Sequence, residues 1–375
     1  MADRDPRRRW GALGVVVAGG GTGGHLFPGI AVACEFSRRN AHSRILFVGA
    51  GRPFEREALQ RAGYPHRSVD VEGIKGRKAT DKLRAALKIP GALRHSAAIL
   101  ADLRADLVIG VGGYAAGPVA LAARLKGIPV VLCEQNIVFG ITNRLLLPMA
   151  QRVYVSFEDT AAGFDGANLR LTGNPVRQQI LDAARARPAV DPGWLTVMVV
   201  GGSQGAHAIN LAVIDALPRL GSRAIIRFIH QTGRADREIV AAAYRQAGIE
   251  AEVKDFFHDM ASRYARADVI VCRAGATTVA ELTALGKPAL LVPYPHAADN
   301  HQERNARVLV EKGAARMIVE RDLTGTVLAR LLDSWIDAPG QLEMMASGSR
   351  RLGRPDAAKR IVDDCYQLLG NKPCT

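Results

Sequence analysis

Two glycine-rich segments of similar sequence are the first candidates for chemistry in this chain. The segment GGGTGGH at 19–25 recurs as GGSQGAH at 201–207. Each copy ends a hydrophobic run that predicts a strand, and each precedes a pattern that predicts a helix. Glycine lets backbone N–H groups approach a pyrophosphate at a helix N-terminus. The repeat therefore predicts two nucleotide-fold halves, each with an anion site at a strand-to-helix turn.

The first copy also matches the dinucleotide-binding fingerprint, because Gly19, Gly21 and Gly24 have the spacing G-x-G-x-x-G. That fingerprint requires an acidic residue about 20 residues later, which holds a ribose. Here the second hydrophobic run continues instead into GAGR at 49–52. An NAD enzyme is therefore not expected. A diphosphate cradle and a tight turn without a ligand both remain open.

His25 follows the first loop directly and is a candidate general base or phosphate donor. A histidine that only caps and packs the helix is the alternative. In the second copy, the Ser203 hydroxyl and the amides near Gly205 have the arrangement of a phosphate site. Two facing anion sites suit a reaction between a nucleotide diphosphate donor and an acceptor that carries a diphosphate.

Two further segments place polar residues where predicted strands end. Gly112 and Gly113 precede Tyr114 in one, and Glu134 begins the tripeptide EQN at 134–136 in the other. Parallel strands share one carboxyl edge, so we expect these groups to converge on the rim of the ligand site. Loop solvation and strand-end hydrogen bonds are the alternative explanation for each of them.

Two helix starts in the second half carry polar pairs with two interpretations. Thr278 and Glu281 have the spacing of a capping box, whereas Glu281 alone would suit both hydroxyls of a ribose. Asp299 and Gln302 have the spacing of a helix cap. Gln302 and Asn305, one turn apart, would alternatively contact sugar hydroxyls from one helix face.

Short β-branched runs alternate with helical segments, which predicts an α/β protein with parallel sheets covered by helices on both faces. With 375 residues, the chain exceeds the size at which single cores stop growing. The predicted strands form two sets, at 13–18, 45–49, 107–110, 129–134 and 152–156, and then at 196–200, 225–230, 269–272 and 289–292.

An Ala- and Arg-rich segment at 181–193, with two prolines, predicts the connection between two domains. We therefore place the first domain at 1–176 and the second at 177–355. The final helix, predicted from Asp356 to Leu369 within the segment 356–375, is expected to pack back on the first domain.

The charge balance favours an acidic partner, with 50 Lys+Arg against 36 Asp+Glu and a net charge of +14. Aromatic residues make up only 5% of the chain, and no basic stretch is interleaved with the aromatic residues on which nucleic-acid bases stack. An anionic membrane or a phosphorylated substrate is therefore expected rather than nucleic acid. Five cysteines without CxxC pairing indicate a reducing cytosol rather than a disulfide framework or a zinc site.

Any membrane contact is expected to be peripheral, because no apolar stretch approaches the roughly 20 residues that span a bilayer. A basic segment suited to an anionic leaflet combines one acid, Asp81, and the apolar residues Leu83 and Leu87 with Lys75, Arg77, Lys78, Lys82, Arg84 and Lys88. An ordinary solvated helix is the alternative.

These loops together resemble the MurG family, the UDP-N-acetylglucosamine:N-acetylmuramyl-(pentapeptide) pyrophosphoryl-undecaprenol N-acetylglucosamine transferases. The resemblance extends from about Gly14 to Ile318. Its most specific stretches are GGGTGGHLFPGIAVA at 19–33, GVGGYAAGPVALAARLKGIPVVLCEQN at 110–136, LTGNPVR at 171–177, VVGGSQGAHAIN at 199–210, DVIVCRAGATTVAEL at 268–282 and HAADNHQERNA at 296–306.

The resemblance implies a GT-B fold, in which two Rossmann-like domains face each other across a deep cleft. It also implies inverting transfer of GlcNAc from UDP-GlcNAc to the 4-hydroxyl of MurNAc in lipid I, which gives lipid II for peptidoglycan synthesis. No cofactor or metal is expected, because helix N-termini and Arg177 can carry the diphosphate charge. The implied location is the cytoplasmic face of the bacterial inner membrane, with cell-wall synthesis proteins as partners.

The family's functional residues carry over to matching positions of this chain. His25 and Glu134 match residues with catalytic roles. Donor-binding roles are implied for Thr22, Gly23, Gly24, Asn136, Arg177, Ser203, Phe257, Ala276, Thr277, Thr278, Val279, Ala280, Glu281 and Gln302. Four positions depart from the family pattern as follows: Cys133 stands for histidine, Ala274 for serine, Thr277 for leucine, and Phe257 for an aliphatic residue near the uracil edge.

Three other functions remain open at this point. Another GT-B transferase, such as a diacylglycerol glycosyltransferase, would share the donor loops and differ in its acceptor. A nucleotide-sugar or membrane docking protein would bind without turnover, which His25 and Glu134 argue against. UDP-GlcNAc epimerisation would need no lipid acceptor.

Overall fold

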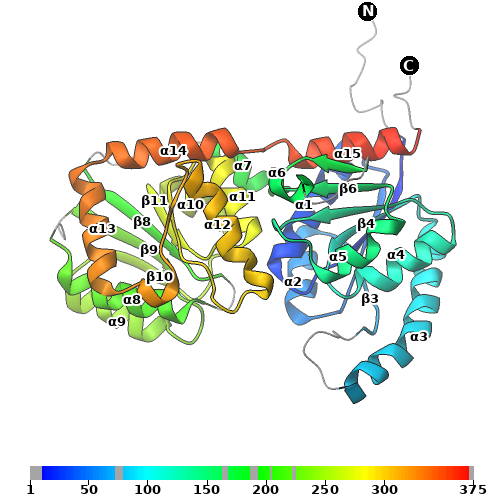
Figure 1. Cartoon of the computed structure of the whole chain (residues 1–375), viewed down its shortest axis with the longest axis horizontal. Coiled ribbons are helices and arrows are strands. Elements are labelled where there is room, and N and C mark those ends of the chain that lie inside the picture. Colours follow the sequence, from blue (N-terminus) through cyan, green and yellow to red (C-terminus); the bar gives the residue numbers. More distant parts are fainter. Residues whose placement is uncertain are drawn as a thin grey trace, which may run out of the picture. The chain divides into compact units, whose positions relative to one another are not determined.

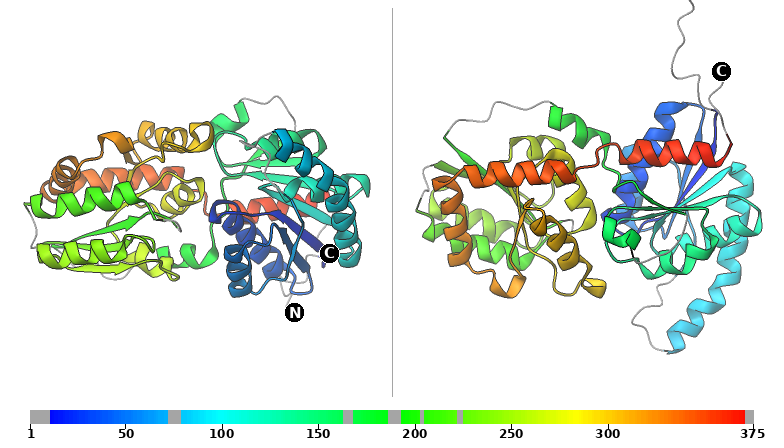
Figure 2. Two further views of the ribbon diagram at one scale, coloured as in Figure 1. Left: turned by 90° about the horizontal axis from the view of Figure 1, so that it is seen from below. Right: turned by 45° about the horizontal axis from the view of Figure 1, so that its top comes forward.

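The computed structural model describes residues 11–71, 79–162, 168–185, 193–202, 205–221 and 225–370, with side chains described over the same ranges except 79–87, 161–162 and 183–185. Two compact units make up the chain. Unit 1 comprises Met1–Arg177 together with Asp356–Thr375, and unit 2 comprises Gln178–Pro355. Figures 1 and 2 show helices on both faces of the sheet in each unit.

Unit 1 is built on a parallel seven-stranded sheet with the strand order β3-β2-β1-β4-β5-β6-β7. Its strands are β1 Gly14–Gly19, β2 Arg44–Gly49, β3 His66–Ser68, β4 Leu107–Gly112, β5 Val130–Glu134, β6 Arg152–Val155 and β7 Leu169–Leu171. Its helices are α1 Gly23–Arg39, α2 Pro53–Ala62, α3 Ala79–Leu103, α4 Ala116–Leu125, α5 Ile141–Leu146, α6 Glu158–Ala162 and α15 Ala357–Leu368, with a 3₁₀ turn at Leu147–Met149.

Unit 2 repeats this plan with a parallel six-stranded sheet in the order β10-β9-β8-β11-β12-β13. Its strands are β8 Leu195–Val200, β9 Ile226–Gln231, β10 Ala251–Lys254, β11 Val269–Cys272, β12 Ala289–Leu291 and β13 Arg316–Met317. Its helices are α7 Gln178–Arg185, α8 His207–Ala216, α9 Arg237–Ala247, α10 Met260–Arg266, α11 Ala276–Leu285, α12 His301–Glu311, α13 Gly325–Asp337 and α14 Gly340–Leu352, with 3₁₀ turns at Leu217–Arg219, Ala298–Asn300 and Glu320–Asp322.

The central strand of unit 1 shows why the hydrophobic runs predict the sheet. All six residues of β1 are buried. Val15 and Val17 pack into the core cluster under α1, whereas Val16 belongs to the cluster under α3 and α4. Side chains of a strand alternate between the two faces, so a strand covered on both faces must be apolar throughout. The predicted parallel α/β fold with two domains is confirmed.

Four edge strands were not predicted from the sequence. They are β3, β7, β10 and β13, which are the outermost strands of the two sheets. They have two to four residues and include polar side chains, as in the tripeptide HRS of β3. An edge strand is only partly covered, so its sequence needs no apolar run. The segment at 181–193 was also misread in part, because residues 181–185 are the end of α7, which packs on α10 and α11.

The last helix, α15, packs on α1 within unit 1. Tyr366 lies against Phe36, with ring centroids 5.7 Å apart. Arg39 of α1 is buried, bonds to the Asp363 carboxylate, and donates to the Lys359 carbonyl at 3.1 Å. Long-range contacts of this kind attach the C-terminal segment to the first half of the chain.

Within the described part of the chain, no helix has both the length and the apolar character needed to cross a membrane. Four cysteines are described, and none of them forms a disulfide. Cys34 is exposed, and the other three, Cys133, Cys272 and Cys365, are buried. The basic residues 75–78 of the predicted membrane segment lie outside the described residues, and the side chains of 79–87 are likewise not described.

Candidate functional site

The glycine loop of unit 1 is fixed by two neighbouring segments. The Gly20 amide donates to the Gly112 carbonyl at 3.1 Å, and the Gly21 amide donates to the Glu55 carboxylate. A Cβ added to Gly113, whose φ is +85°, would lie 2.7 Å from the Gly20 carbonyl oxygen. The loop and the turn after β4 are therefore packed backbone against backbone, as only glycine allows.

Glu55 is the buried anchor of this loop. Its side chain is only 1% exposed, and its second oxygen accepts from the Arg52 amide at 3.1 Å. A Cβ on Gly20 would lie 2.7 Å from Glu55 Oε1. The amides of Gly20 and Gly21 are thus already used inside the protein. Any amide that this loop offers to a ligand lies at Thr22 or beyond, which narrows the cradle expected from the sequence.

His25 is oriented by a side chain from the end of β5. Its Nδ1 lies 2.9 Å from Gln135 Oε1. The Gln135 amide nitrogen donates to the carbonyls of Val111 and Cys133 at 3.1 and 3.0 Å, which fixes the amide so that its oxygen faces the ring. An amide oxygen only accepts, so Nδ1 carries the proton and Nε2 presents a lone pair. His25 is therefore held in the tautomer of a general base.

Glu134 has a different environment, although it precedes Gln135 in the chain. Its carboxylate accepts from the Asn136 amide at 3.0 Å, and from the Gly140 amide and the Asn143 side chain at 2.9 Å each. Glu134 is 2% exposed. Three donors and near-complete burial suit a carboxylate that ties the loop after β5 to α5, and they leave it poorly placed to receive a substrate proton.

Arg177, the last residue of the main part of unit 1, lies near the start of α1. Its guanidinium carbon is 4.1 Å from the centroid of the Phe27 ring. A Cβ on Gly23 would lie 2.9 Å from the same ring. One aromatic ring therefore separates Arg177 from the loop that contains Thr22, Gly23 and Gly24, so a cation lies beside the predicted ligand loop.

The glycine loop of unit 2 is fixed through Gln231 at the end of β9. The Gly201 amide donates to the Gln231 carbonyl at 3.4 Å, and the Gln231 side chain donates to the Gly202 carbonyl at 3.0 Å. The same amide side chain accepts from the Phe257 backbone N–H at 2.9 Å. Phe257 is 1% exposed, so its ring is not available to stack on a base. Ser203 lies outside the described residues.

A polar network lies beneath the start of α8. His207 Nδ1 is 2.9 Å from Asp236 Oδ2, which also accepts from the Asn210 side chain at 2.7 Å. Burial opposes ionisation of Asp236, but hydrogen bonds from Asn210 and His207 outweigh it and lower its pKa. The fully buried His230 bonds to Asn210 and Tyr244, and burial lowers its pKa to about 3.

The helix after β11 begins at Ala276, with Gly275 as the N-cap. The capping box predicted for Thr278 and Glu281 is therefore wrong, because Thr278 lies inside the first turn and not at the cap. Glu281 is 5% exposed and accepts from the Tyr264 hydroxyl at 3.0 Å. The predicted ligand residues from Ala276 through Thr277, Thr278, Val279 and Ala280 to Glu281 form the first six residues of α11.

The predicted cap at Asp299 is also wrong, because α12 begins after Asn300, and no side chain caps it. Gln302 accepts from the Tyr294 amide at 3.0 Å and is partly exposed. Asn305 is fully buried and donates to the Ala274 carbonyl at 3.2 Å, so it supports the loop before α11 and cannot contact a sugar.

In unit 1, the structure brings together most of the residues predicted from the sequence. The loop with Thr22 and His25 follows β1, and the residues from Glu134 to Asn136 follow β5, which is two strands away in the sheet. Among the described residues, no cluster of three His, Cys, Asp or Glu side chains suits a metal ion. Glu55 and Gln231 were not predicted from the sequence. The only sequence signal for Glu55 is its position three residues after Arg52, which ends the GAGR segment at 49–52 and is the N-cap of α2.

Both halves of the chain match known protein families. The glycosyltransferase family 28 N-terminal domain matches residues 15–155, and the family 28 C-terminal domain matches residues 196–361. The two matches fall on the sheets of unit 1 and unit 2 and include both glycine loops. Fold and loops together thus define a two-domain UDP-sugar glycosyltransferase of family 28.

Full-length relatives narrow this class. A UDP-N-acetylglucosamine–N-acetylmuramyl-(pentapeptide) pyrophosphoryl-undecaprenol N-acetylglucosamine transferase from Anaeromyxobacter sp. (strain K) is 47% identical, with 95% of this chain and 93% of the relative covered. The enzyme of the same name from Syntrophus aciditrophicus (strain SB) is 46% identical, with 95% and 98% covered. The crystal structure of Acinetobacter baumannii MurG is similar with a TM-score of 0.76 and 33% identity, over 94% of this chain and 99% of that one. The chain belongs to the MurG family.

Proposed function

We propose that the chain transfers GlcNAc from UDP-GlcNAc to the 4-hydroxyl of MurNAc in undecaprenyl-pyrophosphoryl-MurNAc-pentapeptide, lipid I, with inversion at the anomeric carbon. The product is lipid II, the precursor of peptidoglycan, and UDP leaves. Two relatives above 45% identity carry the name of this reaction over nearly their whole length. The observation on which the mechanism rests is the tautomer of His25 that Gln135 imposes.

The reaction is a single displacement. His25 Nε2 removes the proton of the acceptor hydroxyl while its oxygen forms a bond to the anomeric carbon of GlcNAc. The bond from that carbon to the β-phosphate oxygen breaks, and the electron pair leaves with UDP. Gln135 holds Nδ1–H and stabilises the imidazolium that forms. We assign this role to His25 alone, because the Glu134 carboxylate already accepts three hydrogen bonds.

Donor binding is proposed for residues of both units. In unit 2 we assign the diphosphate to Ser203 and the start of α8, the nucleoside to the Phe257 backbone and α11, and the sugar to Gln302. Aligned backbone N–H groups at helix N-termini favour the negative charge that develops on leaving UDP. In unit 1, Arg177, Asn136 and the residues from Thr22 to Gly24 complete this set. No step needs a metal or a cofactor.

We assign acceptor binding and membrane contact to unit 1. Helix α5 exposes Ile141 by 53% and Leu145 by 69%, and these residues share one helix face. Arg144 beside them is exposed as well. Apolar side chains with an adjacent cation suit an anionic lipid surface, as does the net charge of +14. We infer a peripheral location on the cytoplasmic face of the inner membrane, with lipid I and other proteins of cell-wall synthesis as partners.

The test is incubation of the purified chain with radiolabelled UDP-GlcNAc and a short-chain, water-soluble lipid I analogue. We expect label in a disaccharide-lipid product, with release of one UDP for each GlcNAc transferred. A diacylglycerol acceptor serves as the control and should remain unlabelled. Labelled diacylglycerol, or UDP binding without any lipid product, would contradict the proposed acceptor.

A further inference from the structure

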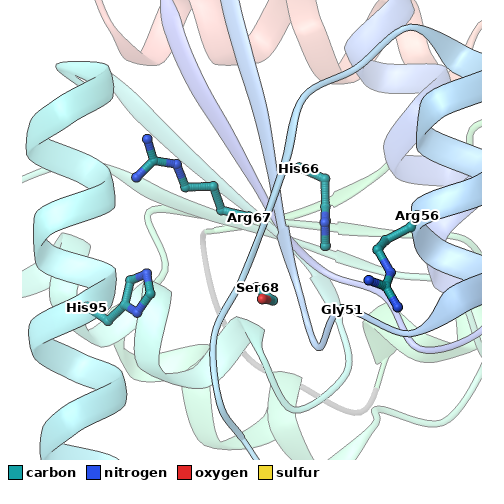
Figure 3. Close-up of a pocket in the computed structure, with 6 residues that line it drawn as sticks. All are labelled: Gly51, Arg56, His66, Arg67, Ser68 and His95. Atoms are coloured by element: carbon teal, nitrogen blue, oxygen red, sulfur yellow. The ribbon is translucent and has the colours of Figure 1, made fainter.

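A shallow pocket on unit 1 lies outside the proposed active site. It opens beside the edge strand β3 and is lined by Gly51, Arg56, His66, Arg67, Ser68 and His95 (Figure 3). Figure 3 shows Arg56 coming from α2 on one side and His95 from α3 on the other, with the residues of β3 between them. None of these residues belongs to the glycine loops or to the proposed donor set.

The lining is basic, and the acids around it already have partners. Arg67 pairs with Asp102 at 3.3 Å. Glu55, on the same helix as Arg56, accepts hydrogen bonds from the backbone amides of Gly21 and Arg52. Among the described residues, the Arg56 guanidinium has neither an ion pair nor a hydrogen bond. The pocket therefore presents hydrogen-bond donors from three segments, one of them the guanidinium of Arg56.

His66 supplies a second indication of a ligand. Its Nε2 atom is shielded from solvent and has no hydrogen-bond partner among the described residues. Burial lowers the pKa of His66. The negative charge of Glu55 opposes this effect only in part, and the positive charge of Arg56 adds a smaller lowering of the pKa. An unsatisfied polar atom beside a basic pocket needs a hydrogen-bond partner, and when the His66 ring is protonated at Nε2 an anion supplies one.

The floor of the pocket is formed where the loop after β2 meets β3. A Cβ on Gly51, whose φ is +74°, would lie 2.9 Å from the Ser68 Cβ, so the loop after β2 packs directly on β3. The Ser68 side chain is exposed beside this contact. A guanidinium, a hydroxyl and imidazole N–H groups are the donors that bind a tetrahedral oxyanion in proteins.

We infer that this pocket is a phosphate-binding site, in which Arg56, His66, Ser68 and His95 hold the phosphate of either a soluble phosphate compound or a membrane-lipid headgroup. The inference stands independently of the proposed transferase reaction. Phosphate brings negative charge beside His66, so it raises the pKa of that imidazole. Binding and proton uptake by His66 are then linked, with Glu55, Arg56, Arg67 and His95 as the other charged or titratable groups around the ring.

The test is an NMR titration of the full chain labelled with ¹⁵N-histidine, in which inorganic phosphate is added at constant ionic strength. His66→Gln identifies the His66 signal among the nine histidines. We expect the His66 titration midpoint to rise by about one pH unit, with saturation. Arg56→Gln should weaken phosphate binding at least tenfold. Arg61→Gln is the matched control, because Arg61 lies on the same helix and pairs with Glu57 at 2.7 Å, so its loss should leave binding within twofold.

Vesicles distinguish the two sources of phosphate. If phosphatidylglycerol vesicles bind the wild type more tightly than Arg56→Gln, and inorganic phosphate competes, the site holds a lipid headgroup. Phosphate binding with equal vesicle affinity of the two proteins instead supports a soluble ligand. An unmoved His66 signal, or an equal effect of sodium chloride, would overturn the site. Transfer of GlcNAc to a water-soluble acceptor by Arg56→Gln should stay normal. A failure of the phosphate site can therefore be distinguished from a failure of the proposed transferase function.

Discussion

The two glycine loops are similar in sequence and differ in what lies beneath them. In unit 1, the Glu55 carboxylate binds the backbone amide of Gly21. In unit 2, the neutral Gln231 side chain binds the Gly202 carbonyl. For the histidines that follow the loops the partners are reversed, with an amide in unit 1 and a carboxylate in unit 2. His25 faces the amide oxygen of Gln135, and His207 faces the carboxylate of Asp236.

The difference indicates that the two loops suit different parts of the proposed reaction. A carboxylate partner stabilises a charged imidazolium, whereas an amide oxygen fixes the tautomer of a neutral ring. The first loop therefore offers a proton acceptor, and its amides before Thr22 are taken. No carboxylate binds the described backbone of the second loop, so this loop suits the negatively charged diphosphate better. The same backbone motif thus has different polar partners in the two units, which is consistent with the two roles proposed above.

The comparison predicts its largest effect for the two histidines. His25→Ala should lower kcat by about 10²–10⁴, because it removes the proposed general base, while the affinity for UDP changes only a few-fold. Steady-state rates and UDP binding to the same preparations measure both quantities. His207→Ala is the control from unit 2 and should lower kcat less than tenfold. Equal losses in the two variants would remove the distinction between the loops.

The anchor of the first loop should affect stability. Glu55→Gln places an amide NH₂ against one of the two N–H groups, of Gly21 or Arg52, so one buried donor loses its acceptor. We expect the free energy of unfolding to fall by about 1–3 kcal/mol, measured by urea titration. Glu57→Gln on the exposed side of the same helix should change it by less than about 0.5 kcal/mol. Similar values for both variants would show that the loop does not depend on this carboxylate.

Buried His230 makes unit 2 sensitive to acid. Its pKa is lowered to about 3 in the folded chain, against about 6.5 when unfolded, so only the unfolded chain takes up this proton between those values. Stability is therefore complete above pH 6.5 and is lost as the pH falls. At pH 5 the free energy of unfolding is lower by about 2 kcal/mol because of this proton.

Urea unfolding at pH 6.5 and pH 5, followed by the fluorescence of Trp194 and Trp335 in unit 2, measures this loss. His230→Gln should be less stable at pH 6.5 and should lose less stability between the two pH values. His42→Gln, which alters an exposed histidine of unit 1, should keep the wild-type difference. An unchanged pH dependence of stability in His230→Gln would show that another group causes the acid sensitivity.

The smallest expected effect comes from giving His25 the kind of partner that His207 has. Gln135→Glu places a carboxylate against Nδ1, which favours the protonated ring. The rate at pH 7 should fall about tenfold, and the acid limb of the pH–rate profile should move up by about one pH unit. Gln135→Leu separates charge from orientation, because it should lower the rate without that displacement. An identical profile for Gln135→Glu would argue against His25 as the base.

Much of the architecture is encoded locally. Runs such as GVVVAG at 14–19 are apolar throughout because both sides of a central parallel strand are covered, and they predicted the interior strands of both sheets. The glycine loops were also predictable from the sequence, since close approach of two backbone segments requires glycine. The edge strands were not, because β3 and β13 gain their conformation from pairing with a neighbour and need no pattern of their own.

Residue types and their order predicted the two-domain parallel fold and the positions of the glycine loops, and they indicated His25 as a candidate base. Tertiary structure alone decided what each polar side chain does. Glu134 and Gln135 are adjacent in the chain, yet successive residues point in opposite directions at a strand end. Glu134 therefore binds the loop after β5, and Gln135 orients His25. Glu55 and Asp236 reach their loops from other segments, and such contacts depend on how the chain folds back on itself.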